Sequence, residues 1–315
     1  MKPVFDLTEA RNRTIGVWVV ILNYNRTLDT IGCLKALNMD GDFQVMVVDN
    51  GSPTNTLIPI LTRFPGVRII RNEKNRGYSG GMNAGLRTVT ALNARYICVL
   101  NNDARFSADS LKLLTEAMDR DPHLAALSPA IYRLDAPTQP WFLGGILDER
   151  SGMAEHHNLM PNAALSNQPW LSGCALVLRE QAIRTVGDFD ERYYAYWEDV
   201  DWSVRARAAG WRLALHREAI AYHRVGSTLP PTSGDAIYYY TRNHLLFVHL
   251  NYHASVKLLS KIAALHLREA LRELRADPQH RVHRLIHTAA GIYDFYRRRF
   301  GARPKPGRNG YKQNV

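Results

Sequence analysis

Apolar and polar positions follow two alternating patterns over the first 120 residues of the chain. Continuous apolar runs predict buried strands, and each is followed by a segment with apolar positions three or four residues apart, which predicts a helix. Strands are expected at residues 15–22, 43–48, 67–70 and 96–100, and helices at 27–37, 55–64, 80–92 and 108–120. This alternation predicts an α/β fold with a Rossmann-like, mainly parallel sheet flanked by helices. Ligands of such sheets lie beyond the carboxyl ends of the strands.

The middle of the chain has a less regular pattern. Residues 134–167 are rich in Pro, Gly and Asn, so we expect loops with one or two short strands. A strand follows at 171–178 and another at 213–222, and a helix between them is expected to begin near Asp201 and to end at Gly210.

The C-terminal region is predicted to be helical from residue 237 to 300, with a break near Pro278. We therefore expect a catalytic domain at residues 1–236, a basic amphipathic helical extension at 237–302, and a disordered polar tail at 303–315.

The net charge of +11 is unevenly placed. The last 74 residues contain 15 Lys and Arg and four Asp and Glu, so they hold the entire excess. On a helical wheel, basic side chains share one face and apolar side chains the opposite one: Lys257, Lys261, Arg268, Arg272 and Arg275 against Leu259, Ala263, Leu267, Ala270 and Leu274. Either the basic face lies on an anionic membrane surface, or the apolar face packs on the rest of the protein and the basic face is merely solvated.

Features of cellular location are few. No apolar run reaches the roughly 18–20 residues that span a bilayer, and the N-terminus lacks the apolar stretch of a secretory signal. Cys33, Cys98 and Cys174 have no metal-ligand spacing and are interpreted as reduced core thiols. We expect a cytoplasmic protein, either free or peripheral on the inner face of the plasma membrane; the sequence does not fix its oligomeric state.

Each of the four early strands ends in polar residues, where a ligand is expected. One such end is explained by a turn or a helix cap, but four in series favour a binding site. The candidate ligand-binding residues are Asn23, Tyr24, Asn25, Asp49, Asn50, Arg76, Gly77, Asn83, Asn101 and Asn102. Asp103 follows the fourth strand, where a carboxylate could ligate Mg²⁺ or Mn²⁺; capping of the next helix is the alternative.

The glycine-rich stretch at residues 77–85 matches neither a dinucleotide fingerprint nor a P-loop. Its glycines would let the backbone approach a ligand at the start of a helix, whose N-terminus favours phosphate. Arg76 could add a charge-assisted bond to a diphosphate. Tight packing of this helix on a strand is the alternative.

Residues 196–202 combine the carboxylates Glu198, Asp199 and Asp201 with three large aromatic side chains. Like charges in a partly dry environment resist ionisation, so this cluster is typical of a site where a carboxylate takes a proton or holds a cation. We expect the neighbouring acids to raise the pKa of Asp199 and strengthen it as a base. Asp201 is expected to be structural, as a helix N-cap or as the i,i+4 partner of Arg205.

Five segments, in this order, resemble the motifs of family 2 glycosyltransferases with the GT-A fold, and of their bacterial rhamnosyltransferase-like branch. They are ILNYN at 21–25, VDNGS at 48–52, NRGYSGGMNAG at 75–85, LNND at 100–103 and WEDVD at 197–201. The run YYYTRN at 238–243 is similar to that branch as well. The resemblance covers roughly residues 14–250 and implies that this chain is an enzyme with a GT-A domain.

The resemblance implies roles on the donor side. Asp49 would contact the base or ribose of the nucleotide, beside the turn at residues 23–25. Asp103 stands where the family has the last aspartate of its DXD motif, the metal and diphosphate ligand, and His223 stands where several relatives have a metal ligand. A satisfied core or surface histidine is the alternative for His223. The motif here has one carboxylate, so whether metal is required stays open.

The resemblance also implies roles on the acceptor side. Asp199 would be the general base that takes the proton of the acceptor hydroxyl. We interpret Glu198 as a residue that orients the acceptor, and Trp197 as an aromatic surface for its sugar, with core packing as the alternative for Trp197.

One base on the acceptor side predicts single displacement with inversion. The first choice of reaction is the transfer of L-rhamnose from dTDP-rhamnose to a glycan or polyprenyl-linked acceptor in polysaccharide synthesis; other UDP- or GDP-sugars are the alternative. A nucleic-acid-binding protein would leave the acidic segment unexplained, so no nucleic-acid partner is expected. A sugar nucleotidyltransferase would need a glycine-rich loop directly after the first strand.

Overall fold

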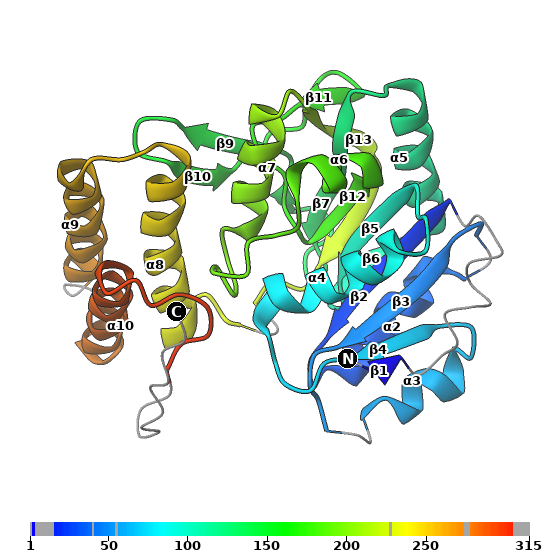
Figure 1. Ribbon diagram of the computed structural model, residues 1–315, viewed down its shortest axis with the longest axis horizontal. Coiled ribbons are helices and arrows are strands. Elements are labelled where there is room, and N and C mark those ends of the chain that lie inside the picture. The colour runs from blue at the N-terminus through cyan, green and yellow to red at the C-terminus, as the bar shows by residue number, and fades with distance from the viewer. Residues whose placement is uncertain are drawn as a thin grey trace.

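Within the described residues, eleven strands form one sheet in the order β1-β4-β3-β2-β5-β12-β7-β13-β11, with β6 paired to β13 and β8 paired to β7 (Figure 1). The computed structural model describes residues 2–3, 16–39, 41–53, 56–226, 229–273 and 278–304. The short strand β1 (Lys2–Pro3) pairs with β4 at the edge of the sheet.

The first half of the sheet has the predicted parallel arrangement. β2 (Val17–Asn23) pairs in parallel with β3 (Gln44–Asp49) and β5 (Tyr96–Asn101), and β3 pairs with β4 (Arg68–Arg71). These strands are almost entirely buried because helices cover them, as their continuous apolar runs require. The covering helices are α2 (Thr27–Leu37), α3 (Ile58–Arg63) and α4 (Gly77–Thr90).

The second half of the sheet adds antiparallel pairs. β12 (Ala175–Arg179) lies antiparallel between β5 and β7 (Leu124–Arg133), and β13 (Arg212–His223) runs parallel to β7. β12 begins four residues later than expected. β7 was not predicted, because its alanines, a serine and a proline lack the β-branched run of the earlier strands. α5 (Ala108–Arg120) lies where expected and packs on this half.

The middle of the chain contains more strand than predicted. Its four short strands are β8 (Pro140–Phe142), β9 (Gly145–Asp148), β10 (Met153–His156) and β11 (Leu165–Asn167). Two other short elements were also not predicted, β6 (Ala104–Phe106) and α6 (Glu180–Val186). Such short segments have little intrinsic preference, so tertiary pairing decides their conformation.

α7 (Glu198–Ala208) begins earlier than the predicted position near Asp201. The residue before it, Trp197, has a left-handed backbone with φ 77°, which breaks the chain direction at that point. Gly210 follows the helix with φ 86°, as expected of a residue that ends a helix.

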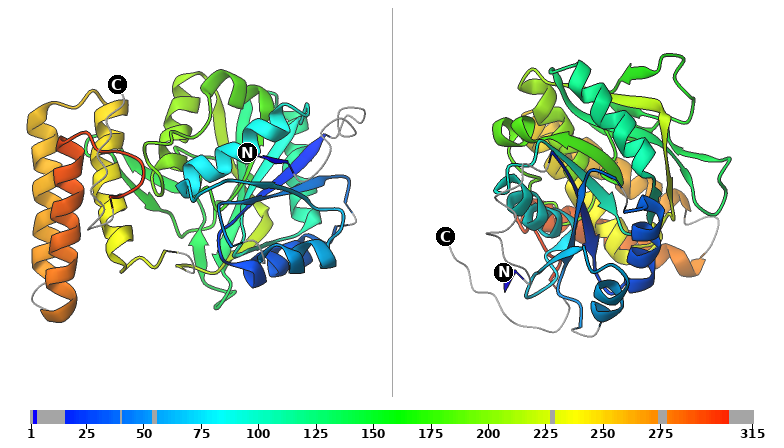
Figure 2. Two further views of the ribbon diagram at one scale, coloured as in Figure 1. Left: turned by 60° about the horizontal axis from the view of Figure 1, so that its bottom comes forward. Right: turned by 90° about the vertical axis from the view of Figure 1, so that its right-hand side faces the viewer.

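Three helices form the C-terminal region: α8 (Gly234–Asn251), α9 (Val256–Glu273) and α10 (Pro278–Tyr296). α10 begins at the predicted proline, but the break between α8 and α9 was not expected. α8 lies between the sheet and the α9–α10 pair (Figures 1 and 2). The expected boundary at residue 236 falls inside α8, and residues 305–315 of the expected tail lie outside the described residues.

No helix in the described part of the chain combines the length and apolarity needed to cross a membrane. The three cysteines are buried, as predicted.

Candidate active site

The ends of β2 and β3 bring Asn23 and Asp49 together at one edge of the sheet. Asn23 Nδ2 donates a hydrogen bond to Asp49 Oδ1 at 3.3 Å, and Arg71 Nε lies 3.3 Å from Asp49 Oδ2. The side chains of Asn23 and Asp49 are fully buried. Asp49 therefore has protein partners in this structure, and its contact with a nucleotide stays a prediction.

Asn50 directly follows β3, and its side chain holds the loop that follows β4. Its Nδ2 donates to Asn75 Oδ1 at 3.0 Å and to the carbonyl of Gly77 at 2.9 Å. Its Oδ1 accepts from Asn72 Nδ2 at 3.0 Å and from the backbone N–H of Arg76 at 3.1 Å. These four bonds use the full capacity of the amide, so Asn50 shapes this loop, and its contact with a donor stays a prediction.

Tyr24 and Asn25 are the accessible residues of the first strand end. Tyr24 is half-buried and Asn25 is exposed. Asn25 has φ 56°, a conformation that asparagine tolerates, and its backbone N–H donates to Ser52 Oγ at 2.9 Å. Both side chains remain open to a nucleotide.

Arg76 forms an ion pair with Glu191. Arg76 Nη2 lies 2.8 Å from Glu191 Oε2, and Arg87 Nη2 lies 3.2 Å from Glu191 Oε1. Glu191 is therefore the partner of Arg76 in this structure, and the bond from Arg76 to a diphosphate stays a prediction.

α4 begins at Gly77, and its first amides have a protein acceptor. The backbone N–H groups of Tyr78 and Ser79 donate to the carbonyl oxygen of Tyr194 at 2.6 and 3.3 Å. Gly77 has φ 73°, and a side chain there would collide with Tyr194. The start of α4 is therefore packed against the segment before α7. Packing of this helix on a strand, the stated alternative, is seen further along, where a Cβ at Gly85 would collide with Val20 of β2 and Val48 of β3.

Asn83 is a structural link. It is fully buried, its Nδ2 donates to the carbonyl of Phe189 at 2.8 Å, and its Oδ1 accepts from the N–H of Phe189 at 3.1 Å. Its expected contact with the donor stays a prediction.

The end of β5 is joined to the other strand ends through α2. Asn101 is the last residue of β5, and Asn102 Nδ2 donates to Thr30 Oγ1 at 3.1 Å. Thr30 Oγ1 in turn donates to Asn23 Oδ1 at 2.9 Å. This chain of hydrogen bonds fixes the turn that carries Asp103.

Asp103 and His223, the two predicted metal ligands, lie side by side. His223 Nε2 is 3.3 Å from Asp103 Oδ1, and both side chains are buried. β6 pairs with β13 and places His223 opposite Ala104, which explains the contact. No group of three or more His, Cys, Asp or Glu side chains with the arrangement of a metal site occurs among the described residues. One carboxylate and one imidazole, completed by diphosphate oxygens, nevertheless form a donor set that fits Mg²⁺ or Mn²⁺.

Arg224 adds a positive charge that sequence analysis missed. Its backbone N–H donates to the carbonyl of Asp103 at 3.1 Å, and its side chain is 55% exposed. Its Nη1 lies 3.4 Å from Asp29 Oδ1, and Arg26 Nη1 lies 3.7 Å from Asp29 Oδ2. An arginine directly after a candidate metal ligand was the signal in the sequence.

Trp197 is packed inside the protein. It is 4% exposed and its ring stacks on that of His244, with centroids 4.6 Å apart and planes 5° from parallel. Tyr240 and Phe247 also contact the indole. This environment supports the core-packing alternative over the stacking of Trp197 on an acceptor sugar.

Asp199 is a buried carboxylate held by two backbone donors. Gly173 N–H donates to Asp199 Oδ2 and Val200 N–H donates to Asp199 Oδ1, both at 2.9 Å. Burial raises the pKa of Asp199 above its usual value, while these two hydrogen bonds oppose the rise. The rise was expected from the neighbouring acids, but burial is its cause.

Glu198 is buried beside Asp199, and its carboxylate lacks the two N–H donors that Asp199 has. Burial, and then the charge of Asp199, raise the pKa of Glu198 well above its usual range. Its Oε2 is buried without a hydrogen-bond partner among the described residues. Because Asp199 has two N–H donors, the negative charge of the pair is favoured on Asp199 over Glu198.

Asp199 lies at the same edge of the sheet as Asp103. Gly173, which donates to Asp199, precedes Cys174, whose carbonyl accepts from the N–H of Asn101 at 2.8 Å. Asp103 is two residues beyond Asn101. One sheet edge therefore carries a candidate base and a candidate cation site.

Asp201 has the predicted structural role, but not as an N-cap. Asp201 Oδ2 lies 2.8 Å from Arg205 Nε, as the i,i+4 spacing predicted. Tyr193 Oη and Asn251 Nδ2 donate to Asp201 Oδ1 at 3.1 and 2.9 Å. The N-cap expectation is wrong because the helix begins before this residue.

Aromatic residues of the middle segment line the neighbourhood of His223. Trp141 lies edge-on to His223 and His156, with ring centroids 4.4 and 4.6 Å away. His156 Nδ1 donates to the carbonyl of Trp141 at 2.8 Å. The sequence pattern predicted loops with one or two short strands here, and only the Trp and His residues of this segment could have indicated the site.

Comparison with known proteins identifies the domain. Residues 18–180 match the model of glycosyl transferase family 2. The chain is 31% identical over 210 residues to the N-acetylglucosaminyl-diphospho-decaprenol L-rhamnosyltransferase of Mycobacterium tuberculosis, covering 58% of this chain and 67% of that protein. It is 24% identical over 247 residues to the dTDP-rhamnosyl transferase RfbF of Shigella flexneri, covering 75% and 81%.

Solved structures share the fold at low sequence identity. GalNAc-T7 with UDP, GalNAc and Mn²⁺ superposes with a TM-score of 0.60 and 14% identity over 90% of this chain and 56% of that chain. The mannosyltransferase PcManGT from Pyrobaculum calidifontis, in complex with GDP-Man and Mn²⁺, superposes with a TM-score of 0.56 and 11% identity over 91% and 88%. The family match spans more than half of the sequence, and with the shared fold it shows that this chain belongs to glycosyl transferase family 2 and has the GT-A architecture.

Proposed function

We propose that this chain is an inverting glycosyltransferase that moves L-rhamnose from dTDP-rhamnose to a hydroxyl of a glycan or lipid-linked acceptor in cell-surface polysaccharide synthesis. The observation that carries the proposal is the buried, hydrogen-bonded Asp199 at the same sheet edge as the Asp103–His223 pair. Two relatives that bear rhamnosyltransferase names support the choice of sugar. Another UDP- or GDP-sugar is the alternative, because solved proteins of this fold bind UDP and GDP-Man.

Asp199 acts as the base in this proposal. It accepts the proton of the acceptor hydroxyl, which attacks the anomeric carbon from the face opposite to the leaving diphosphate. The two N–H donors keep Asp199 ionised in its buried position. A single base and a single attack invert the anomeric configuration.

The leaving diphosphate gathers negative charge, and Asp103 and His223 would hold a Mg²⁺ or Mn²⁺ ion beside it. Bound there, the cation would neutralise that charge. Arg224, exposed next to Asp103, would add a second positive group toward the diphosphate. Tyr24 and Asn25 offer the open contacts for the nucleotide.

Thermal-shift screening of nucleotide-sugars, with and without Mn²⁺, tests the donor. We expect dTDP-rhamnose with Mn²⁺ to raise the melting temperature more than UDP-glucose or GDP-mannose does, because binding to the folded state stabilises it. A larger rise in melting temperature with a UDP- or GDP-sugar would show that this sugar nucleotide, and not dTDP-rhamnose, is the donor. Stabilisation by no nucleotide-sugar would overturn the transferase proposal.

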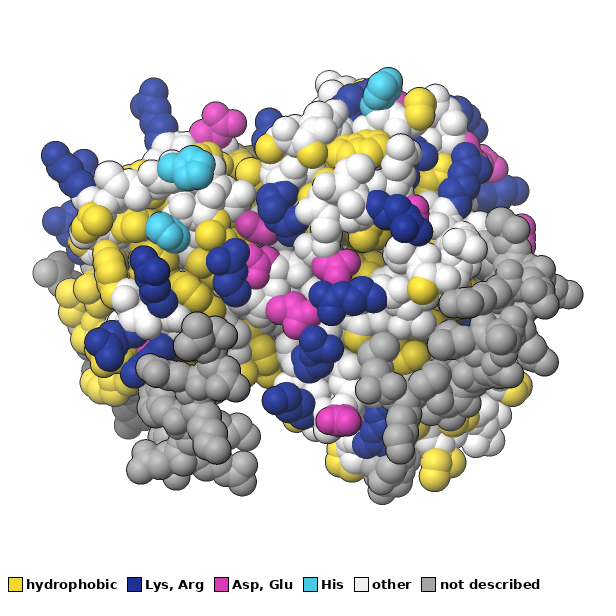
Figure 3. Space-filling view, in the orientation of Figure 1, with side chains coloured by type: hydrophobic (Ala, Val, Ile, Leu, Met, Phe, Trp, Pro, Cys, Tyr) yellow, Lys and Arg dark blue, Asp and Glu magenta, His cyan; other side chains and the backbone are white. Residues whose placement is uncertain are grey.

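We also infer that the chain works on the inner face of an anionic membrane, where lipid-linked acceptors are available. Lys257, Lys261, Arg268 and Arg272 are exposed on α9, whereas Arg275 lies outside the described residues. α10 presents an apolar stripe at helical spacing, formed by Val282, Ile286 and Tyr293, which are 60%, 56% and 56% exposed. Figure 3 shows hydrophobic side chains among Lys and Arg at this end of the molecule.

The two interpretations of α9 are compatible. Leu259, Ala263 and Ala270 are buried, so the apolar face of α9 packs inside the protein as one alternative required. The basic face of α9 faces solvent and would attract anionic headgroups. The apolar stripe of the neighbouring α10 would insert into the lipid, which electrostatic attraction alone does not achieve. We assign α8 to the sugar-transfer domain, because it holds the segment before α7, and α9–α10 to the membrane-facing extension.

A further inference from the structure

The segment before α7 has an unusual backbone. Tyr194, Tyr196 and Trp197 have φ values of 67°, 66° and 77°. Residues with a Cβ rarely adopt this left-handed conformation, and it persists only where the surrounding structure enforces it. Asp199 follows two residues after Trp197, so whatever enforces this backbone also places the base.

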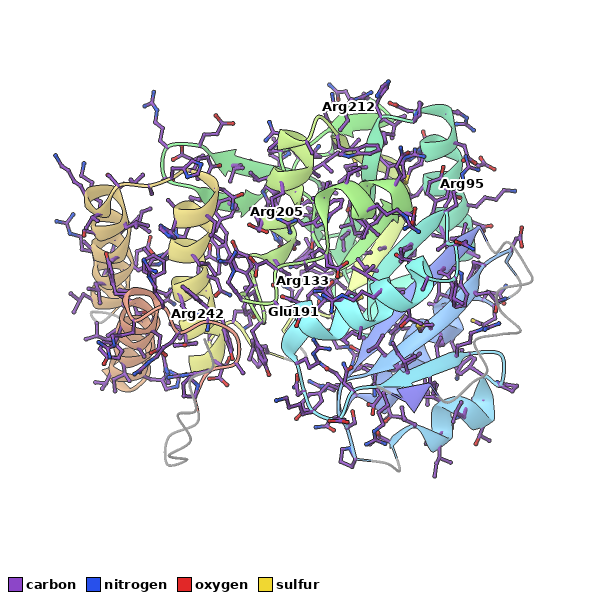
Figure 4. All side chains as sticks on the ribbon, in the orientation of Figure 1. Arg95, Arg133, Glu191, Arg205, Arg212 and Arg242 are labelled. Carbon is purple, nitrogen blue, oxygen red and sulfur yellow. The ribbon has the colours of Figure 1, made fainter. Side chains whose placement is uncertain are left out.

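Arg242 and Asn243, consecutive residues of α8, hold this left-handed backbone in place. The side chains of Arg242 and Asn243 are fully buried and donate to carbonyl oxygens of the segment at 2.7–3.0 Å. Arg242 Nη2 donates to those of Arg192 and Tyr193, and the two N–H groups of Asn243 Nδ2 are shared among those of Tyr193, Ala195 and Tyr196. Figure 4 shows Arg242 on α8 facing the segment that carries Glu191 and leads to α7.

His244, the next residue of α8, holds the end of the segment through its ring. It stacks face to face on Trp197 and is fully buried. This contact fixes the plane of the indole directly before Glu198 and Asp199.

The orientation of His244 is fixed in turn by α9. Its Nε2 lies 3.2 Å from the carbonyl of Ser151, which can only accept, so Nε2 carries the hydrogen. Nδ1 of His244 then accepts from Nε2 of His266 on α9, at 2.9 Å. His266 is also buried, so both rings are neutral partners in one directional chain.

We propose that the His244–His266 pair is a positioning device, through which α9 sets the left-handed backbone of Trp197 and thereby the location of Asp199. The inference rests on the proposed role of Asp199 as base. A shift of about 1 Å in a catalytic group can lower turnover by about 10²-fold, so loosening this chain reduces kcat while the donor side, formed by other elements, is unaffected.

Three variants of the full chain test the device. His266→Ala removes the donor, His266→Gln replaces it with an amide N–H, and His244→Phe keeps a flat ring on Trp197 but removes both hydrogen bonds. His283→Ala is the matched control, because His283 and His287 form another histidine ring pair, on α10, with centroids 4.3 Å apart. Turnover, the KM for donor and the hydrogen exchange of residues 192–201 are measured for each variant.

We expect His266→Ala and His244→Phe to lower kcat by about tenfold or more, with a donor KM within about twofold of the wild type and faster exchange at residues 192–201. His266→Gln is expected to restore most of kcat, and His283→Ala to match the wild type. Unchanged exchange and kcat in His266→Ala would overturn the device, as would an equal loss in His266→Gln.

Failure of the proposed reaction is distinguishable from failure of the device. If the wild type transfers no sugar, the reaction assignment fails. The exchange comparison still decides whether α9 holds the segment, since it needs no substrate.

Discussion

Gly173 donates its backbone N–H to Oδ2 of Asp199 at 2.9 Å, and its own carbonyl accepts from Tyr78 Oη at 2.6 Å. Gly173, which lies between β11 and β12, thereby joins the candidate base to α4. The ionised form of Asp199 depends on this bond, because burial alone favours the protonated acid.

Asp199→Asn is expected to keep the fold and donor binding and to cut turnover by about 10²-fold or more, since the amide cannot accept a proton. Steady-state transfer assays measure the loss, and a nucleotide titration checks donor affinity. Asp109→Asn, which removes an exposed carboxylate on α5, serves as the control. Turnover of Asp199→Asn near that of the wild type would remove Asp199 from the mechanism.

Gly173→Ala is expected to lower turnover without unfolding the protein. A Cβ at this position would lie 2.9 Å from Tyr78 Oη and 3.5 Å from the Cβ of Asp199, so the tyrosine must shift. Combining this variant with Tyr78→Phe relieves the contact and should recover part of the activity. No recovery in the double variant would show that the loss has another origin.

Glu198→Gln is expected to stabilise the protein at neutral pH. The folded-state pKa of Glu198 is raised, so its contribution to stability is complete below the unfolded pKa and is lost as the pH rises toward the folded value. The glutamine amide does not titrate, so the variant does not lose stability in this pH range. We expect a gain of about 1 kcal/mol or more at pH 7, or roughly 2–4 °C in melting temperature, and a smaller gain near pH 4.5. Equal gains at both pH values would contradict this titration.

Asp103→Asn and His223→Ala are expected to abolish the additional thermal stabilisation that Mn²⁺ gives in the presence of the nucleoside diphosphate. Asp135→Asn is the control, because Asp135 is an exposed carboxylate paired with Arg133. A full Mn²⁺ effect in both site variants would show that the ion, if bound, uses other ligands.

Lys261→Glu with Arg268→Glu is expected to weaken binding to vesicles of phosphatidylglycerol and phosphatidylcholine by about 30-fold or more, at about 1 kcal/mol for each basic residue removed. Ile286→Asp should weaken binding through the apolar stripe. Lys112→Glu, on the exposed side of α5, is the matched charge control. Wild-type binding that is equal on phosphatidylcholine alone, or insensitive to salt, would contradict the membrane surface.

The elements predicted best were those with long, regular patterns. The parallel strands from β2 to β5 and their helices follow from continuous apolar runs and helical spacing, and their last residues lie together at one edge of the sheet, as predicted. β7 and the strands of the middle segment could not be predicted, because short or alanine-rich strands depend on the partners they find in the folded protein. The contact of His223 with Asp103 needed the pairing of β6 with β13, which no local pattern encodes.

Three polar residues at and near the start of α4 show what a single sequence cannot predict. Arg76, Asn50 and Asn83 have side chains suited to a ligand, yet their partners come from residues far along the chain. A single sequence shows which groups can bind but not which ones the protein itself occupies. Trp197 is the same case among the aromatic residues.

The three buried thiols have a practical consequence for fluorescence work. Burial raises the pKa of Cys33 to about 12 and that of Cys174 well above its usual value, and Cys98 is fully buried as well. A maleimide dye reacts with the thiolate of an accessible cysteine, so the native chain offers it no ready target. A cysteine introduced at Val282 or Ile286 would therefore take the label alone, and an environment-sensitive dye there would report directly whether α10 enters the lipid.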